Sequence, residues 1–136
     1  MKSKVYFIDL KASHKENVLS KIEKLLETAG LASIFRSRDL VAVKLHFGEK
    51  GNTAFVRPVF IRKIVESIKA AGGMPFLTDT NTLYADQRSS TPRHIITAVE
   101  NGFAFSVVDA PIVIADGLKG KSEVAVGIHQ KNFEKV

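Results

Sequence analysis

The sequence has 136 residues and contains no cysteine. Without cysteine, this chain can form neither a disulfide nor a thiolate-ligated zinc or iron–sulfur centre. We therefore expect no cofactor of that kind within residues 1–136. The length is that of one compact domain, so a second domain with its own core is not expected.

Long hydrophobic runs are also absent. Among the longest is Ile112–Ala115, which is far too short to cross a bilayer. No signal-like apolar stretch with a cleavage site follows the N-terminus. These absences predict a cytoplasmic protein with no membrane partner.

Charge of one sign is in modest excess. Lysine and arginine number 20 against 14 acidic residues, a net charge of +6. The basic residues are scattered, with no run of five and no interleaved aromatic residues, so a nucleic-acid partner is not expected. The excess is compatible with a small polar or anionic ligand.

The hydrophobic pattern alternates between strands and helices. The helix after the first strand begins at a Ser13–Glu16 capping box and ends at Gly30, and one more helical turn is expected within 31–39. Strands are expected at 4–10, 40–46, 74–79, 103–108, 112–115 and 123–128, and further helices from Pro58 to Gly72 and from Thr91 to Asn101. Near-continuous apolar strands between helices predict a three-layer, doubly wound α/β fold, with a mostly parallel sheet and helices on both faces.

After Asp116 the pattern offers a turn and an alternating segment, Val124 to Ile128, but no final helix. We therefore expect 1–136 to be a single α/β domain that forms the N-terminal portion of a longer protein. An uncovered strand edge would pair with the remainder of the chain or with a second copy, so a homodimer is expected in isolation. The alternative is a loosely ordered tail on a complete domain.

In open α/β sheets, ligands bind beyond the carboxyl ends of the strands. The expected strand ends are Asp9, His46, Asp79, Asp109 and Asp116, although aspartate also often caps the following turn.

Lys44 is unusual because strand alternation places it with Ala42 on a face that helices are expected to cover. A buried ammonium needs a carboxylate, and Asp79 is the natural partner. Alternatively, Lys44 lies near enough to the strand end for its amine to reach water.

Two loops at these ends are rich in polar groups and glycine. The loop 47–53 has the position and glycine content of an anion cradle but matches no nucleotide-binding motif, and a plain flexible turn is the alternative. In the loop 79–88, Tyr84 and Arg88 are placed to clamp a polar ligand, unless this is an ordered surface loop. The predicted ligand-binding residues are Lys44, His46, Gly48, Glu49, Gly51, Asn52, Asp79, Asn81, Tyr84, Arg88 and Asp116.

A metal site is a weaker expectation. Its candidate ligands are His46, Glu49, Asp79 and His94, which have no metal-binding spacing and would have to be assembled by the fold. The serines lie in no Gly-x-Ser-x-Gly motif, so nothing indicates nucleophilic hydrolysis.

Segments 43–53 (VKLHFGEKGNT) and 79–84 (DTNTLY) closely resemble a family of uncharacterised iron–sulfur-centre proteins of bacteria and archaea, grouped as a domain of unknown function of the 362 type. Segments 97–103 and 111–120 are also similar to it. The resemblance implies an α/β region that continues well beyond the equivalent of Val136 into a ferredoxin-like pair of cysteine motifs binding [4Fe-4S] clusters. Those motifs are absent here, so the resemblance carries no redox activity over to this chain, and it identifies no catalytic residues.

Two functional hypotheses follow. In the first, this is the N-terminal ligand- or partner-binding region of a [4Fe-4S] redox protein, which works with the remainder of its own chain or with a redox partner. In the second, it is a stand-alone enzyme with a metal- or lysine-centred site at the carboxyl ends of the strands.

Overall fold

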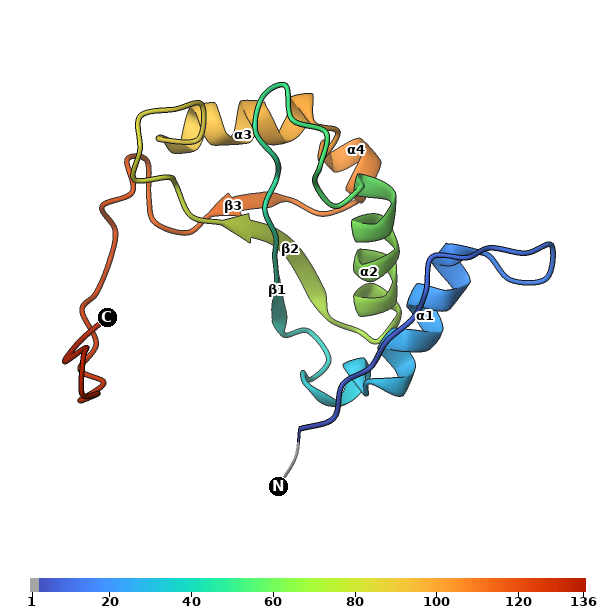
Figure 1. Cartoon of the computed structure of the whole chain (residues 1–136). Coiled ribbons are helices and arrows are strands. Elements are labelled where there is room, and N and C mark those ends of the chain that lie inside the picture. Colours follow the sequence, from blue (N-terminus) through green and yellow to red (C-terminus); the bar gives the residue numbers. More distant parts are fainter. Residues whose placement is uncertain (1–2) are drawn as a thin grey trace.

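The structure is a computed structural model that describes residues 3–136. The strands and helices alternate along the chain as an α/β protein requires (Figure 1). In chain order they are α1 (Val18–Thr28), the 3₁₀ turn η1 (Leu31–Ser33), β1 (Leu40–Lys44), α2 (Pro58–Ala70), β2 (Met74–Asp79), α3 (Thr91–Glu100), α4 (Phe105–Val108) and β3 (Ile112–Ile114).

The three strands form one parallel sheet in the order β1-β2-β3. Lys44 lies opposite Thr78, and Asp79 lies opposite Ile114. The carboxyl ends of all three strands therefore meet at one edge of the sheet. The prediction of an α/β fold with a parallel sheet is confirmed.

The core lies on one face of this sheet. Leu45 and Leu77 pack there against Ile61 and Val65 of α2 and against Ala98 of α3. Each strand adds to the same side of the previous one, and right-handed crossovers then place the connecting helices on a single face.

The opposite face of the sheet, which we call the open face, carries Leu40, Ala42 and Lys44 of β1, Met74 of β2 and Val113 of β3, all of them exposed. Helices were expected on both faces. Within residues 3–136 the second helical layer is not found.

Helix α1 begins later than its sequence pattern suggests. Asn17 accepts from the Ser20 amide at 3.0 Å, and Ser20 Oγ accepts in return from the Asn17 amide at 3.2 Å. The Ser13 hydroxyl instead accepts from the amides of Lys15 and Glu16, in a turn that precedes the helix. The predicted Ser13–Glu16 capping box is thus wrong by one turn.

The segment Lys4–Leu10 was predicted to be a strand, and this is wrong for the structure. It is extended but pairs with no strand, and Val5 and Phe7 are 90% and 85% exposed. Among residues 3–136, strand β1 is paired only with β2. Asp9 accordingly does not lie at a strand end.

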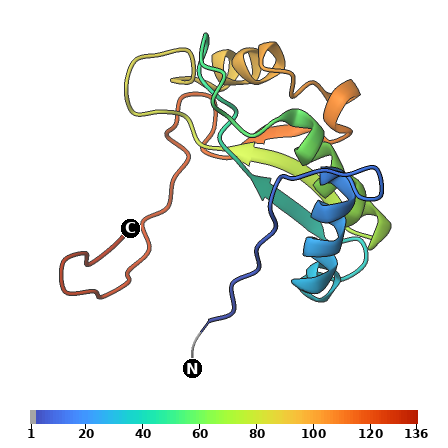
Figure 2. The same cartoon turned by 45° about the vertical axis from the view of Figure 1, so that its right-hand side comes forward.

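Two further strand predictions fail near the C-terminus. Residues 105–108 form the short helix α4 rather than a strand, and this helix ends at Asp109 in the left-handed conformation, with a φ of 59°. Residues 123–128 form no strand; Gly127 makes an isolated antiparallel bridge to Lys135. Both views show this C-terminal segment extending away from the sheet (Figures 1 and 2). Among residues 3–136, no helix has the length and hydrophobicity that crossing a membrane would need.

Candidate functional site

Lys44 and Asp79 meet at the carboxyl edge of the sheet. Lys44 Nζ lies 2.9 Å from Asp79 Oδ1, so the predicted pairing is confirmed. The expected burial of Lys44 is wrong, because its side chain belongs to the open face and is 68% exposed. The ammonium therefore reaches water, as the alternative interpretation proposed, while its buried carboxylate partner fixes its position.

Arg88 lies at the centre of the charged groups at this edge. Its side chain is 5% exposed, its Nε donates to Glu49 Oε1 at 2.9 Å, and its Nη1 donates to Asp79 Oδ2 at 3.2 Å. Arg88 thus joins the loop after β1 to the end of β2. We call Arg88, Glu49, Asp79, Lys44 and Tyr84 the Arg88 cluster.

Tyr84 completes this cluster at the surface. Its hydroxyl donates to Glu49 Oε1 at 2.8 Å and accepts from Arg88 Nη2 at 3.2 Å. The Arg88 guanidinium lowers the pKa of Glu49 from 4.5 to about 2, and the Tyr84 hydroxyl adds to this effect. The hydrogen bond to Glu49 in turn raises the pKa of Tyr84 above 10.0. Glu49 is therefore ionised at neutral and mildly acidic pH.

His46 lies beside the cluster and is exposed. Its Nδ1 accepts from the Gly48 amide at 2.9 Å, and its Nε2 lies 3.9 Å from Glu49 Oε1. The short turn from His46 to Glu49 therefore aims both side chains at the same edge.

The glycines of the loop after β1 have different roles. Gly48 has a φ of +86°, and a Cβ there would lie 2.5 Å from Cδ1 of Phe55. Gly48 is therefore required by close packing. Gly51 also has a positive φ but faces open space, and Asn52 accepts from the Ala54 amide at 2.7 Å in a local turn. Gly51 and Asn52 are exposed, and the Asn52 amide donates to the Glu49 carbonyl at 3.1 Å, so Asn52 is tied to the backbone of the Arg88 cluster.

Asn81 and Asp116 form a second pair next to the cluster. The backbone amide of Asn81 donates to Asp116 Oδ2 and its Nδ2 donates to Asp116 Oδ1, both at 2.8 Å. A hollow of about 790 Å³ lies over this pair, and Tyr84 and Lys119 also line it. The structure therefore places five of the predicted site residues in the Arg88 cluster and places Asn81 and Asp116 at this hollow, with Tyr84 shared. The remaining four, His46, Gly48, Gly51 and Asn52, lie in the loop after β1.

Sequence reasoning missed two residues that hold this edge together. Thr91 Oγ1 donates to the Gly117 carbonyl at 2.8 Å, and Asn101 Nδ2 donates to the Phe47 carbonyl at 3.0 Å. Thr91 is the first residue of α3 and Asn101 follows its last residue, where the sequence indicated only a helix start and a helix end. Their partners are backbone carbonyls of distant loops, which no local pattern identifies.

His94 is fully buried under the cluster. Its Nε2 lies 3.8 Å from Asp79 Oδ2, and its ring meets the Phe47 ring edge-on at a centroid distance of 5.7 Å. Burial, and then the nearby Arg88 charge, lower the pKa of His94 below 6.5. Within the described part of the chain, neither ring nitrogen has a hydrogen-bond partner. The buried oxygens Glu49 Oε2 and Asn81 Oδ1 also lack a partner there.

The candidate metal ligands do not form a metal site. Over residues 3–136 no group of three histidine or carboxylate side chains is placed to hold a metal ion. The Arg88 guanidinium lies between Glu49 and Asp79, while His46 is exposed and His94 is buried. Within the described residues the fold does not bring these four candidates together as metal ligands, because an arginine joins the two carboxylates instead.

The fold and the site define an α/β protein with a polar cluster at the carboxyl edge of a parallel sheet. Residues 41–136 match the family described as "Domain of unknown function (DUF362)". The chain belongs to this family, and the matched range contains all of the Arg88 cluster. No curated protein and no solved structure matched the chain.

Proposed function

We propose that this chain is a ligand-binding α/β region, and that its ligand is a small polar or anionic molecule held at the carboxyl edge of the sheet. The observation that carries the proposal is an exposed cation fixed by a buried anion: Lys44 is largely exposed, whereas its partner Asp79 is buried and also paired with Arg88. Surface lysines are usually mobile, and holding one in place reduces the entropy lost when a ligand binds.

The groups beside Lys44 indicate the kind of ligand. One of its three N–H donors is used by Asp79, which leaves two for a ligand. The His46 side chain lies at the same edge and is also exposed, and its Nδ1 already accepts from the Gly48 amide, which leaves Nε2 to donate to a ligand. A group rich in acceptors, such as a carboxylate or phosphate, fits this set. The net charge of +6 favours the approach of an anion.

The proposal includes a redox context. The resemblance to iron–sulfur-centre proteins supports a role beside [4Fe-4S] clusters, held by further residues of its own chain or by a separate redox partner. Residues 1–136 have no thiolate to hold such a cluster. The clusters would therefore take up or supply electrons, while this region would bind the small molecule.

A titration of the ¹⁵N-labelled full chain followed by NMR tests the binding proposal, with inorganic phosphate and malonate as separate probes. We expect saturable shifts at the amides of Gly48, Asp79 and Tyr84. Lys44→Met should remove them. Lys50→Met is the matched control, because Lys50 is a similarly exposed lysine of the adjoining loop whose ion pair is with Glu100 instead.

Saturable shifts that survive in Lys44→Met, or their absence with both probes, would contradict a site for small anions centred on Lys44. Equal losses of the saturable shifts in the two lysine variants would show that anion binding depends only on the net charge of the protein.

A further inference from the structure

One edge of strand β1 is unpaired within residues 3–136. The Leu45 amide donates to the Thr78 carbonyl of β2 at 3.1 Å. Along a parallel strand, the backbone N–H and C=O groups of successive residues point alternately to one neighbouring strand and to the other. The amides and carbonyls of Leu40, Ala42 and Lys44 therefore point away from β2. Beside this edge, on the core side of the sheet, lies a hollow of about 700 Å³ with an apolar lining that includes Val43. An extended apolar segment is the kind of occupant that fits such an edge.

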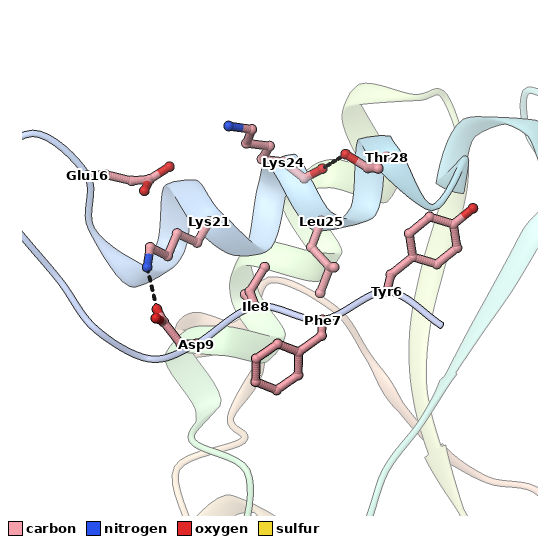
Figure 3. Close-up of a pocket in the computed structure, with 9 residues that line it drawn as sticks. All are labelled: Tyr6, Phe7, Ile8, Asp9, Glu16, Lys21, Lys24, Leu25 and Thr28. Atoms are coloured by element: carbon pink, nitrogen blue, oxygen red, sulfur yellow. Dashed lines mark hydrogen bonds and ion pairs between the residues drawn. The ribbon is translucent and has the colours of Figure 1, made fainter. Parts of the chain in front are cut away.

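The N-terminal segment 4–10 is extended and apolar. Figure 3 shows it beneath α1, with Ile8 directed toward Leu25 and Phe7 directed away from the helix. Asp9 holds the segment there through an ion pair with Lys21 at 2.5 Å. The packing is loose, because a hollow of about 480 Å³ remains between the segment and α1.

The segment and β1 match when they are aligned in parallel with Lys4 opposite Asp39. Ile8 then lies opposite Val43, and Asp9 lies opposite Lys44. Lys4 and Asp9 are five residues apart, as are Asp39 and Lys44, and the order of the charges is reversed. Both ends of this alignment therefore pair a lysine with an aspartate.

The same alignment agrees with the two faces of the sheet. On the core side it places three apolar residues of the segment beside three of β1 and its extension: Tyr6, Ile8 and Leu10 beside Val41, Val43 and Leu45. On the open face it places Val5 and Phe7 beside Leu40 and Ala42. A shift by one residue would put the apolar residues of the core side on the open face and would separate both charge pairs.

The position of α1 supports this arrangement. Helix α1 packs beside α2, and none of its residues is buried although one of its faces is apolar. A strand added at the edge of β1, followed by α1 and then β1, would form a right-handed crossover like those that follow. Ile8 already faces α1, so it would keep this orientation as the segment moves toward β1.

We propose that segment 4–10 is a strap that closes onto the edge of β1 as a fourth parallel strand, with Lys4 opposite Asp39. Closure breaks the Asp9–Lys21 ion pair and brings the Asp9 carboxylate to Lys44, at the mouth of the Arg88 cluster. The pairing itself does not depend on the proposed function.

Because the chain has no cysteine, a pair of introduced cysteines reports the closure directly. Tyr6→Cys with Val41→Cys places both thiols on the core side of neighbouring strands, within reach of a disulfide. In dilute full-length protein we expect oxidation to give an internal disulfide, seen as a faster band on a non-reducing gel and as protection from alkylation. The matched control is Tyr6→Cys with Ala42→Cys, which places the thiols on opposite faces and should remain reduced.

Hydrogen exchange gives a second reading without any cysteine. The amides of Ala42 and Lys44 should exchange at least tenfold faster when Phe7→Asp weakens the strap, whereas those of Val41 and Val43, bonded to β2, should not change. Equal cross-linking of both cysteine pairs would overturn the proposed register. A disulfide-linked dimer would show that the occupant is a second copy, and an absence of cross-linking would show that the segment stays under α1.

Discussion

Replacing Arg88 by methionine should destabilise the protein strongly, because two carboxylates lose their shared partner. Arg88 is almost fully buried and donates to both Glu49 and Asp79. Removing one member of a buried ion pair typically costs about 3–5 kcal/mol, because the remaining charge is left without compensation. Lys44 still pairs with Asp79, so we expect the lower end of this range.

The pH dependence follows from Glu49. Its pKa is lowered from 4.5 to about 2 in the folded protein, so the ionised form stabilises the fold above pH 4.5. This stabilisation is lost as the pH falls from 4.5 through 2. The shift corresponds to at most about 3 kcal/mol, and solvent screening at this partly exposed group reduces it to roughly 1–2 kcal/mol.

Urea unfolding at pH 7 and pH 3 measures both effects. We expect the difference in unfolding free energy between the natural chain and Arg88→Met to be larger at pH 7 than at pH 3. Arg62→Met is the control, because Arg62 forms an exposed pair with Glu66 and should change stability by at most about 1 kcal/mol. The assigned role of Arg88 would be refuted if Arg88→Met lost no more unfolding free energy than Arg62→Met, or if its loss did not depend on pH.

Three other predictions concern the packing of Gly48 and the titration of His94 and Tyr84. Gly48→Ala should lower the melting temperature by more than Gly51→Ala, by the equivalent of about 1–3 kcal/mol, because only its Cβ would collide with Phe55; equal losses in thermal melts would contradict this. His94 should titrate below pH 6.5 by NMR, since its pKa is lowered. The free energy of unfolding should therefore fall as the pH drops below 6.5. His94→Leu should remove this pH dependence without lowering the free energy of unfolding at pH 7. In a Tyr6→Phe background, the ultraviolet titration of Tyr84 should have its midpoint above pH 10.0, and a midpoint at or below 10.0 would contradict the hydrogen bond that raises it.

Much of the fold follows from local pattern. The parallel α/β class, helix α2 with Pro58 in its first turn, and β2 are all predictable, because hydrophobic periodicity and helix stop signals act within a few residues. The segment Phe103–Val108 shows the limit of this approach. Its apolar residues suit a strand, yet a helical turn forms there because Phe103 and Val108 are both buried in the core.

The sequence predicted which residues form the candidate site better than it predicted how they are arranged. Lys44 was paired correctly with Asp79 because strand ends meet in a parallel sheet. Its burial was predicted wrongly, since helices were expected on both faces of the sheet, whereas within residues 3–136 they cover only the face opposite Lys44. The central position of Arg88 was not predicted, because it depends on how the loop after β2 folds back toward Glu49.

The loop Thr80–Ser90 is anchored near both of its ends, and part of the stretch between these anchors is exposed. Asn81 is bonded to Asp116 near one end, and Arg88 is bonded to Glu49 and Asp79 near the other. Leu83, which lies between these anchors, is fully exposed. Proteases cut native proteins where a short stretch of backbone can leave its surroundings without unfolding the rest, so limited proteolysis should begin here. Both anchors would survive the cut, and we expect the two fragments to remain associated.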